Sequence, residues 1–203
     1  MYLSEITLNL FNRNSMRVLA DIYKTHQFVM AGFVAYGSQE HRVLYRVEHE
    51  IRNEAAVARI LVQSSLRPDW AGREEETLRI QTKEFNPDLP VGARYKFRLQ
   101  VNPIVTRNGK RSGLIRDEAL CEWLKKRENV IGAVFQSFVA VDEGYSTGKK
   151  SENGRDHKIS IKKARFEGSL KVADPDILRE AVTKGIGPAK AFGCGLLSLL
   201  RSG

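Results

Sequence analysis

The stretch RYKFRLQVNPIVTR, residues 94–107, sets the pattern of the second half of the chain. Its basic and apolar side chains alternate, which is typical of a β-strand with one buried face. Asp174 is placed to cap a later helix, with Pro175 in its first turn. Outward from this strand, hydrophobic periodicity predicts a helix over 116–128, strands over 131–141 and 157–172, a helix over 174–184 and a strand over 196–200.

This order is β-α-β-β-α-β, the split βαβ motif of ferredoxin-like domains. The first half follows it in part, because its second helix is weak. Residues 67–92 are rich in charge and proline and are expected to be irregular. We therefore expect an α+β fold of two tandem ferredoxin-like (RRM-like) domains, residues 1–90 and 91–203. In the first half the sequence predicts a strand over 2–10, one helix from Asn14 or Ser15 to about Ala35, and strands over 43–47 and 57–64.

The net charge of +9 is concentrated in one half of the chain. Residues 1–90 carry 11 Lys/Arg and 12 Asp/Glu, whereas residues 91–203 carry 22 and 12. A neutral half joined to a basic half indicates nucleic-acid binding. A basic surface kept for solubility is the weaker interpretation, because solubility does not require charge to be concentrated.

Basic residues gather in two regions that would suit the phosphates of an RNA stem. The alternative is a solvated strand face, but seven cations within residues 149–165 repel one another unless an anion lies between them. The polar segment EGYSTGKKSENGRD, residues 143–156, is expected to be a flexible loop. The candidate RNA-binding residues are Arg155, Lys158, Lys162, Lys163 and Arg165, with a second row at Arg94, Lys96 and Arg98.

The segment GIGPAKAFGCG, residues 185–195, is rich in glycine. It lacks the third glycine of a dinucleotide fingerprint and the Gly-Lys-Ser/Thr of a P-loop. Its glycines could let the backbone approach a phosphate, or could serve a tight turn that needs positive φ. The candidate residues of this loop are Gly185, Gly187, Lys190, Gly193 and Gly195.

Tyr23 and His26 lie three residues apart on a predicted helix, so a phenol and an imidazole can serve one site. The same helix carries an apolar stripe that includes Ile22, His26 and Val29. From composition alone, a buried structural histidine is the favoured interpretation of His26.

Several other classes are excluded by pattern. The histidines form no H-x-T pair and no H-E-x-x-H, and no carboxylate cluster suits magnesium. Cys121 and Cys194 match no metal-ligand spacing and are expected to be reduced thiols. The start of the chain does not resemble a signal peptide, and no apolar window is long enough to span a membrane. We expect a cytoplasmic protein without a cofactor, a metal ion or a membrane partner.

Taken together, these residues resemble the CasE family, the CRISPR repeat-RNA endoribonuclease of the type I-E Cascade complex. The resemblance covers essentially the whole chain. Its most specific part is residues 185–199, GIGPAKAFGCGLLSL, which match the family's pattern of two glycine–hydrophobic–glycine triplets separated by five residues. The other matching parts are MYLSEITLNL at 1–10, Tyr23-x-x-His26, FRLQVNPI at 97–104 and FEGSLKV at 166–172.

The resemblance implies two ferredoxin-like domains and an endoribonuclease that binds the repeat stem-loop, cuts once at the 3′ base of the stem and stays with its product in Cascade. It also implies that His26 is catalytic, with Tyr23 as its partner. The expected reaction is metal-free attack by the substrate's 2′-hydroxyl, which leaves a 5′-hydroxyl and a 2′,3′-cyclic phosphate. Two alternatives are a non-catalytic RNA-binding subunit in which His26 is structural, and a structural subunit that binds an acidic protein.

Overall fold

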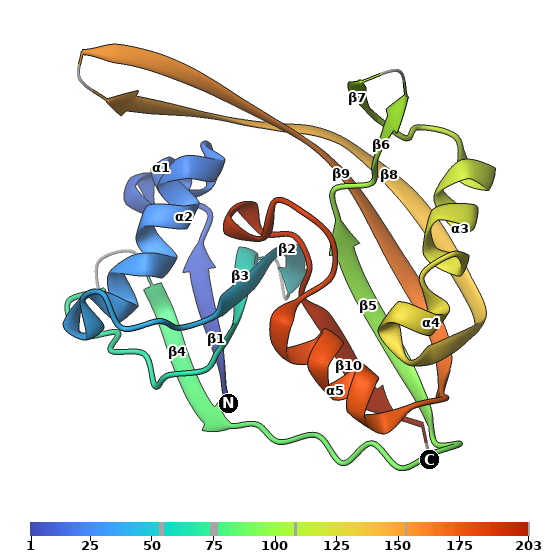
Figure 1. Ribbon diagram of the computed structural model, residues 1–203. Coiled ribbons are helices and arrows are strands. Elements are labelled where there is room, and N and C mark those ends of the chain that lie inside the picture. The colour runs from blue at the N-terminus through green and yellow to red at the C-terminus, as the bar shows by residue number, and fades with distance from the viewer. Residues whose placement is uncertain (53–54, 74–76, 108, 153, 203) are drawn as a thin grey trace. The chain divides into compact units, whose positions relative to one another are not determined.

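Two four-stranded sheets organise the computed structural model, which describes residues 1–52, 55–73, 77–107, 109–152 and 154–202 (Figure 1). The chain divides into two units, and each is formed by segments that are distant in sequence. The first contains Met1–Asn86, Ser146–Ser160 and Ala191–Gly193. The second contains Pro87–Tyr145, Ile161–Lys190 and Cys194–Gly203. The chain therefore passes between the units several times, whereas the sequence suggests one boundary near residue 90.

The first unit is built on β1 (Tyr2–Asn9), whose alternate side chains enter the core. Ile6 lies opposite Ile60 on one neighbouring strand and Ile80 on the other, both antiparallel. The order of the sheet is β2-β3-β1-β4, which is the order of a ferredoxin-like domain. The other three strands are β2 (Val43–Arg52), β3 (Ala55–Ser64) and β4 (Thr77–Glu84).

The first helical region is not the single helix predicted from the sequence. It consists of α1 (Arg13–Leu19), α2 (Ile22–Met30) and the 3-10 helix η1 (Ala31–Tyr36). Asp21 has an extended backbone, and its side chain accepts hydrogen bonds from the first turn of α2. Since an N-cap begins a new helix, Asp21 ends the first helix as it starts the second.

Strand β4 lies within residues 67–92, so the prediction that this whole region is irregular was wrong. The strand pairs with β1 at the edge of the sheet. Most of its side chains are exposed, so it lacks the apolar alternation from which a strand is predicted.

The core of the first unit lies between its sheet and the helical region. It joins apolar side chains of β1 and β3 to those of α2 and η1, and Trp70 closes it. Phe33 and Trp70 meet edge to face, with ring centroids 5.9 Å apart. This packing fixes α2 against the sheet, and with it the residues that α2 presents to solvent.

The second unit contains the complete β-α-β-β-α-β order. Its sheet has the order β10-β5-β9-β8, again that of a ferredoxin-like domain. The prediction of two ferredoxin-like domains in an α+β fold is thereby confirmed. The elements that lie in this unit, in whole or in part, are β5 (Arg94–Val101), α3 (Asp117–Lys125), α4 (Glu128–Ile131), β8 (Ala133–Glu152), β9 (Arg155–Val172), α5 (Pro175–Lys184), η2 (Lys190–Phe192) and β10 (Leu197–Arg201).

Aromatic and aliphatic side chains fill the core of this unit. Trp123 of α3 stacks on Phe166 of β9, with centroids 6.1 Å apart and planes inclined by 6°. Leu178 and Val182 of α5 are fully buried. Helix α5 begins as predicted, with Asp174 capping it and Pro175 in its first turn.

The stretch 94–107 forms two strands instead of the one predicted. Strand β5 ends at Val101, and β6 (Ile104–Arg107) pairs with β7 (Lys110–Gly113) in a small hairpin of its own. Pro103 lies between them and has no N–H for a ladder, which accounts for the break.

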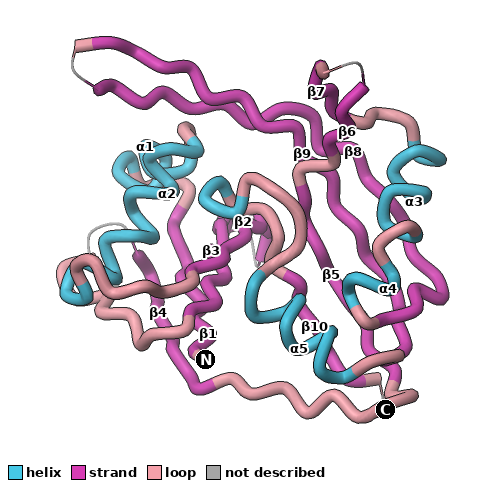
Figure 2. The backbone as a smooth tube through the Cα atoms, viewed as in Figure 1, coloured by secondary structure: helices cyan, strands magenta, loops and turns pink. Residues whose placement is uncertain are grey.

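The segment 143–156 is not a loop in the structure. Strands β8 and β9 continue through it as a long hairpin (Figure 2), and its described residues lie within them except Gly154, which is in a turn. Most of its side chains are exposed, so its polar composition reflects exposure and not an absence of strand structure. The distal part of this hairpin, Ser146–Ser160, belongs to the first unit.

Among the described residues, none of the helices is both long and apolar enough to cross a membrane. Cys121 and Cys194 are free thiols. Burial raises the pKa of Cys194 to about 11, so this thiol stays protonated near neutral pH.

Candidate catalytic pair and nucleic-acid interface

Helix α2 brings Tyr23 and His26 together. Residues three apart share a helix face, and the two ring centroids are 6.1 Å apart with planes inclined by 34°. Both side chains are half-buried. The spacing predicted this arrangement, in which a phenol and an imidazole can reach one bound group.

His26 lies at the edge of the apolar stripe and not inside the core. Ile22 and Val29 of the same stripe are buried, whereas the imidazole of His26 keeps a partly open face. Its Nδ1 is buried and has no hydrogen-bond partner in the part of the chain that the structure describes. The protein therefore does not provide hydrogen-bond partners for both ring nitrogens of His26, as it would for a structural histidine in the core.

Burial sets the protonation state of His26. Desolvation lowers the pKa of the imidazole, and a hydrogen bond with the backbone of Ala191 raises it by a smaller amount. The neutral imidazole is thus favoured in the free protein at neutral pH. A neutral imidazole can accept a proton, and it can return that proton to a leaving group.

The glycine-rich segment supplies the wall beside His26. Phe192 has its ring centroid 6.0 Å from that of His26, and residues 191–193 belong to the same unit as α2. The phenolic hydroxyl of Tyr45, on β2, donates to the carbonyl of Ala191 at 3.0 Å. A contact between strand β2 and the segment thus holds it beside the imidazole.

All four glycines of the motif have positive φ, between 76° and 91°. A Cβ at Gly195 would lie 2.9 Å from the carbonyl oxygen of Ile186. Lys190 donates to the carbonyl of Gly187 at 2.5 Å. The backbone conformation therefore requires these glycines, as the alternative of a tight turn with positive φ predicts. The residues concerned are Gly185, Gly187, Gly193 and Gly195.

Exposed cations line the distal hairpin. Lys149 pairs with Asp156 at 2.6 Å and Lys150 with Glu152 at 2.6 Å. The pKa of Lys150 is raised, mainly by its hydrogen bond and ion pair with Glu152 and in smaller part by an electrostatic interaction with Tyr23. The ammonium group of Lys150 therefore interacts electrostatically with the phenol of the candidate pair. Arg155 and Lys158 are exposed as predicted.

Two of the predicted RNA-binding lysines are buried. Lys162 is 5% exposed, forms an ion pair with Asp142 and lies over the ring of Tyr145. Lys163 is 9% exposed, and burial lowers its pKa. Lys158 and Lys162 share strand parity, but Gly113 of β7 lies against the side chain of Lys162, whereas Lys158 is in solvent. The structure does not bring Lys162 and Lys163 to the surface with Lys158.

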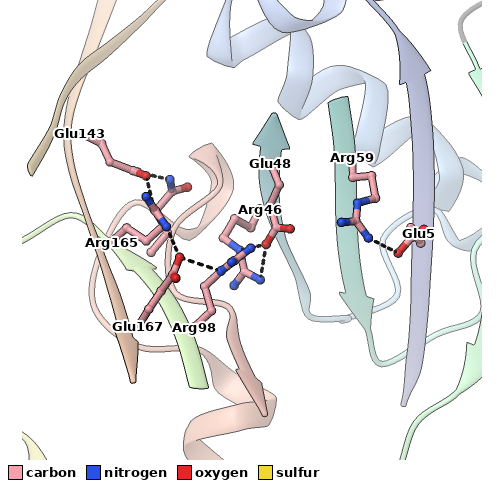
Figure 3. A network of polar contacts seen from close by, with 9 residues as sticks. Glu5, Arg46, Glu48, Arg59, Arg98, Glu143, Arg165 and Glu167 are labelled. Atoms are coloured by element: carbon pink, nitrogen blue, oxygen red, sulfur yellow. Dashed lines mark hydrogen bonds and ion pairs between the residues drawn. The ribbon is translucent and has the colours of Figure 1, made fainter. Parts of the chain in front are cut away.

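The second basic row is split by ion pairing. Arg94 and Lys96 are exposed on β5, whereas Arg98 pairs with Glu167 at 2.9 Å. Figure 3 shows Arg165 between Glu143 and Glu167, and both carboxylates bond its guanidinium. Positive and negative side chains therefore neutralise one another on part of this face. Arg94 and Lys96 are the exposed cations of β5.

Three contributors to this site were not predicted from the sequence. Phe192 packs on His26, Lys150 interacts electrostatically with Tyr23, and Asp21 caps α2. Only Asp21 left a signal, because an aspartate directly before the first apolar residue of a helix is an N-cap pattern. The other two depend on contacts between segments more than 120 residues apart, which local patterns do not report.

Comparison with known proteins identifies relatives along the whole chain. The family model described as CRISPR associated protein matches residues 1–201. The chain is 31% identical to CRISPR-associated endoribonuclease Cse3 of Thermus thermophilus, over 98% of this chain and 99% of that protein. It is also 31% identical to CRISPR system Cascade subunit CasE of Escherichia coli K12, over 88% of this chain and 92% of that protein.

The fold is similar to that of a solved relative. A structure of CRISPR endoribonuclease Cse3 bound to 19 nt RNA superposes with a TM-score of 0.86, at 28% sequence identity. The match covers 99% of this chain and 100% of the other. The similarity therefore includes both sheets and the elements between them.

Proposed function

We infer the function from one premise: this chain belongs to the CasE family of CRISPR-associated proteins. We propose that it is an endoribonuclease that binds the stem-loop of CRISPR repeat RNA, as the names of its relatives support. It cuts at the 3′ base of the stem to release mature guide RNA, and it works as a subunit of a Cascade complex in the cytoplasm.

One observation carries this proposal: Tyr23 and His26 share a face of α2, and the imidazole is half-buried with its pKa lowered. Cleavage of RNA without a metal ion uses the substrate's 2′-hydroxyl as nucleophile on the adjacent phosphorus. The protein has to move one proton from that hydroxyl and one to the 5′-oxygen that leaves. General acid or base catalysis of this kind contributes roughly 10²–10⁴-fold in rate.

In the proposed mechanism His26 transfers a proton and Tyr23 is its partner or a hydrogen-bond donor. The exposed cations of the hairpin, among them Lys150 near Tyr23, stabilise charge on the phosphorane. Attack by the 2′-hydroxyl leaves a 2′,3′-cyclic phosphate on one product and a 5′-hydroxyl on the other. Neither product contains an oxygen from water.

The test is incubation of repeat RNA with the protein in an excess of EDTA. We expect one cut at the 3′ base of the stem, with no loss of rate when Mg²⁺ is withheld. End-group analysis should find the cyclic phosphate and the free 5′-hydroxyl. Cleavage that needs an added divalent ion, or that leaves a 5′-phosphate, contradicts the mechanism. A gel shift of the stem-loop without any cut supports a non-catalytic RNA-binding subunit instead.

A further inference from the structure

The carboxylate of Asp21 accepts hydrogen bonds from two different elements. Its Oδ1 accepts from the backbone N–H groups of Tyr23 at 2.7 Å and Lys24 at 3.2 Å, in the first turn of α2. Its Oδ2 accepts from the backbone N–H of Lys149 at 2.9 Å, on β8. An N-cap needs only the first pair, so the third bond links α2 to the hairpin.

Gly148 allows this contact because it has no side chain. A Cβ at this position would lie 2.6 Å from Oδ1 of Asp21 and 2.9 Å from the backbone nitrogen of Tyr23. Real Cβ atoms do not approach a carboxylate oxygen or a backbone atom that closely. The backbone of β8 therefore lies directly against the start of α2, and all these residues belong to the first unit.

Strand β8 can make this contact because it is the edge strand of its sheet. The N–H groups on the open side of an edge strand have no ladder partner, and an acceptor from elsewhere can bind them. Asp21 is such an acceptor for Lys149. The next residue, Lys150, is the one whose ammonium group interacts electrostatically with Tyr23.

We propose that Asp21 and Gly148 form a clasp that holds α2 in register with the cationic hairpin, so that Asp21 is a positioning residue for RNA cleavage. The inference rests on the proposed function, in which α2 carries the reacting side chains and the hairpin grips RNA. A cavity of about 370 Å³ beside the clasp is lined by Asp21, Lys149 and Lys158. RNA held by the lysines is thereby kept at a set distance from Tyr23 and His26.

In-line attack depends on this register. A misplacement of about 1 Å can cost roughly 100-fold in rate, even when the reacting groups are intact. Loss of the clasp leaves the exposed cations of the hairpin in place. RNA affinity is therefore preserved while the cleavage step slows.

The first variant is Asp21→Asn, which distinguishes the N-cap of α2 from the hydrogen bond to the backbone of Lys149. Asparagine is as good an N-cap as aspartate, so α2 can still start at Ile22. Its amide presents one acceptor and one donor, so either the cap or the Lys149 N–H loses its partner. The matched control is Asp174→Asn, because Asp174 caps α5 through the same two kinds of bond and is not part of the hairpin contact.

The experiment measures single-turnover cleavage, stem-loop affinity and exchange of the Lys149 amide hydrogen. For Asp21→Asn we expect cleavage to slow by about 10- to 100-fold, affinity close to wild type and faster exchange at Lys149. Gly148→Ala should slow cleavage in the same way by forcing the two backbones apart. Asp174→Asn should cleave at the wild-type rate.

A wild-type cleavage rate in Asp21→Asn overturns the inference. So does a loss of rate that is matched by losses of affinity and melting temperature, because that is the pattern of a purely structural role. His26→Ala belongs in the same series. If that variant cleaves normally, the proposed function fails, whereas amide exchange at Lys149 still reports whether the clasp exists.

Discussion

His26 shows why a residue's role cannot be assigned from its stripe alone. Its position on the helix places it among Ile22 and Val29, which are buried, and composition favours a structural histidine there. In the structure the imidazole ring lies at the edge of the core, with Phe192 on one side. Its Nδ1 has no hydrogen-bond partner among the described residues. A half-buried imidazole keeps access to a substrate and has its pKa lowered by the protein.

The lowered pKa predicts the pH dependence of cleavage. A free histidine has a pKa of about 6.5, and desolvation of His26 disfavours its charged form. In a plot of kcat/KM against pH, the change that is due to His26 should therefore have its midpoint below pH 6.5. The rate rises with pH through this midpoint if His26 is the base, and falls if it is the acid. Measurements of kcat/KM over the acidic pH range, for the wild type and for Tyr23→Phe, give the midpoint that belongs to His26. A midpoint well above 6.5 contradicts the burial effect.

The same shift has a consequence for stability. Because the folded-state pKa lies below the unfolded one, the unfolded chain binds the proton more readily. The contribution of neutral His26 is therefore fully present above the unfolded pKa. It is lost as the pH falls from there toward the folded pKa.

At the level of single residues, the motif-bearing positions could be predicted and the buried cations could not. Tyr23 and His26 meet as their spacing indicates, and Asp174 caps α5. Lys162 and Lys163 could not be told from Lys158, because a basic strand does not report which of its positions other elements cover. Only tertiary packing decides that.

The strand segments that the sequence did not predict lie mostly in solvent. Strand β4 and the distal part of the β8–β9 hairpin have few buried side chains, so neither shows apolar alternation. Strand β4 pairs with β1, about 75 residues away in the sequence, whereas the two strands of the hairpin pair with each other. Elements that bury one face, such as β1 and α5, were predicted close to their observed ends.

Strand β9 provides a test within one element. Lys158 is exposed and is proposed to contact phosphate, so Lys158→Ala should lower the salt dependence of RNA binding by about one unit of slope, with modest loss of affinity. Titrations of stem-loop RNA at several salt concentrations measure this slope. An unchanged slope in Lys158→Ala places the RNA on another face.

Lys162→Ala is the matched variant on the same strand. Its buried ammonium bonds Asp142, so its removal should lower stability by about 1–3 kcal/mol and leave the salt slope intact. Thermal unfolding measures the first effect. A reduced slope at full stability contradicts the structural role of Lys162.

For the whole molecule, the division into units shows that the first unit is more positively charged than the first half of the sequence. Residues 146–160 carry Lys149, Lys150, Arg155 and Lys158 against two acidic residues, and they belong to the unit that contains α2. The halves of the sequence therefore do not correspond to the charge of the folded units. The order of elements predicted both sheets, but local patterns do not show where the end of a long hairpin packs.

The central claim is that the imidazole of His26 performs the cleavage step on RNA gripped by cations elsewhere. Single-turnover cleavage by His26→Ala at saturating protein tests it most directly, with stem-loop affinity measured on the same samples. Gln27→Ala is the matched control, since Gln27 is exposed on the same helix. We predict that His26→Ala loses roughly 10²–10⁴-fold in rate at near wild-type affinity, while Gln27→Ala cleaves normally. Cleavage by His26→Ala at the rate of the control would contradict the account.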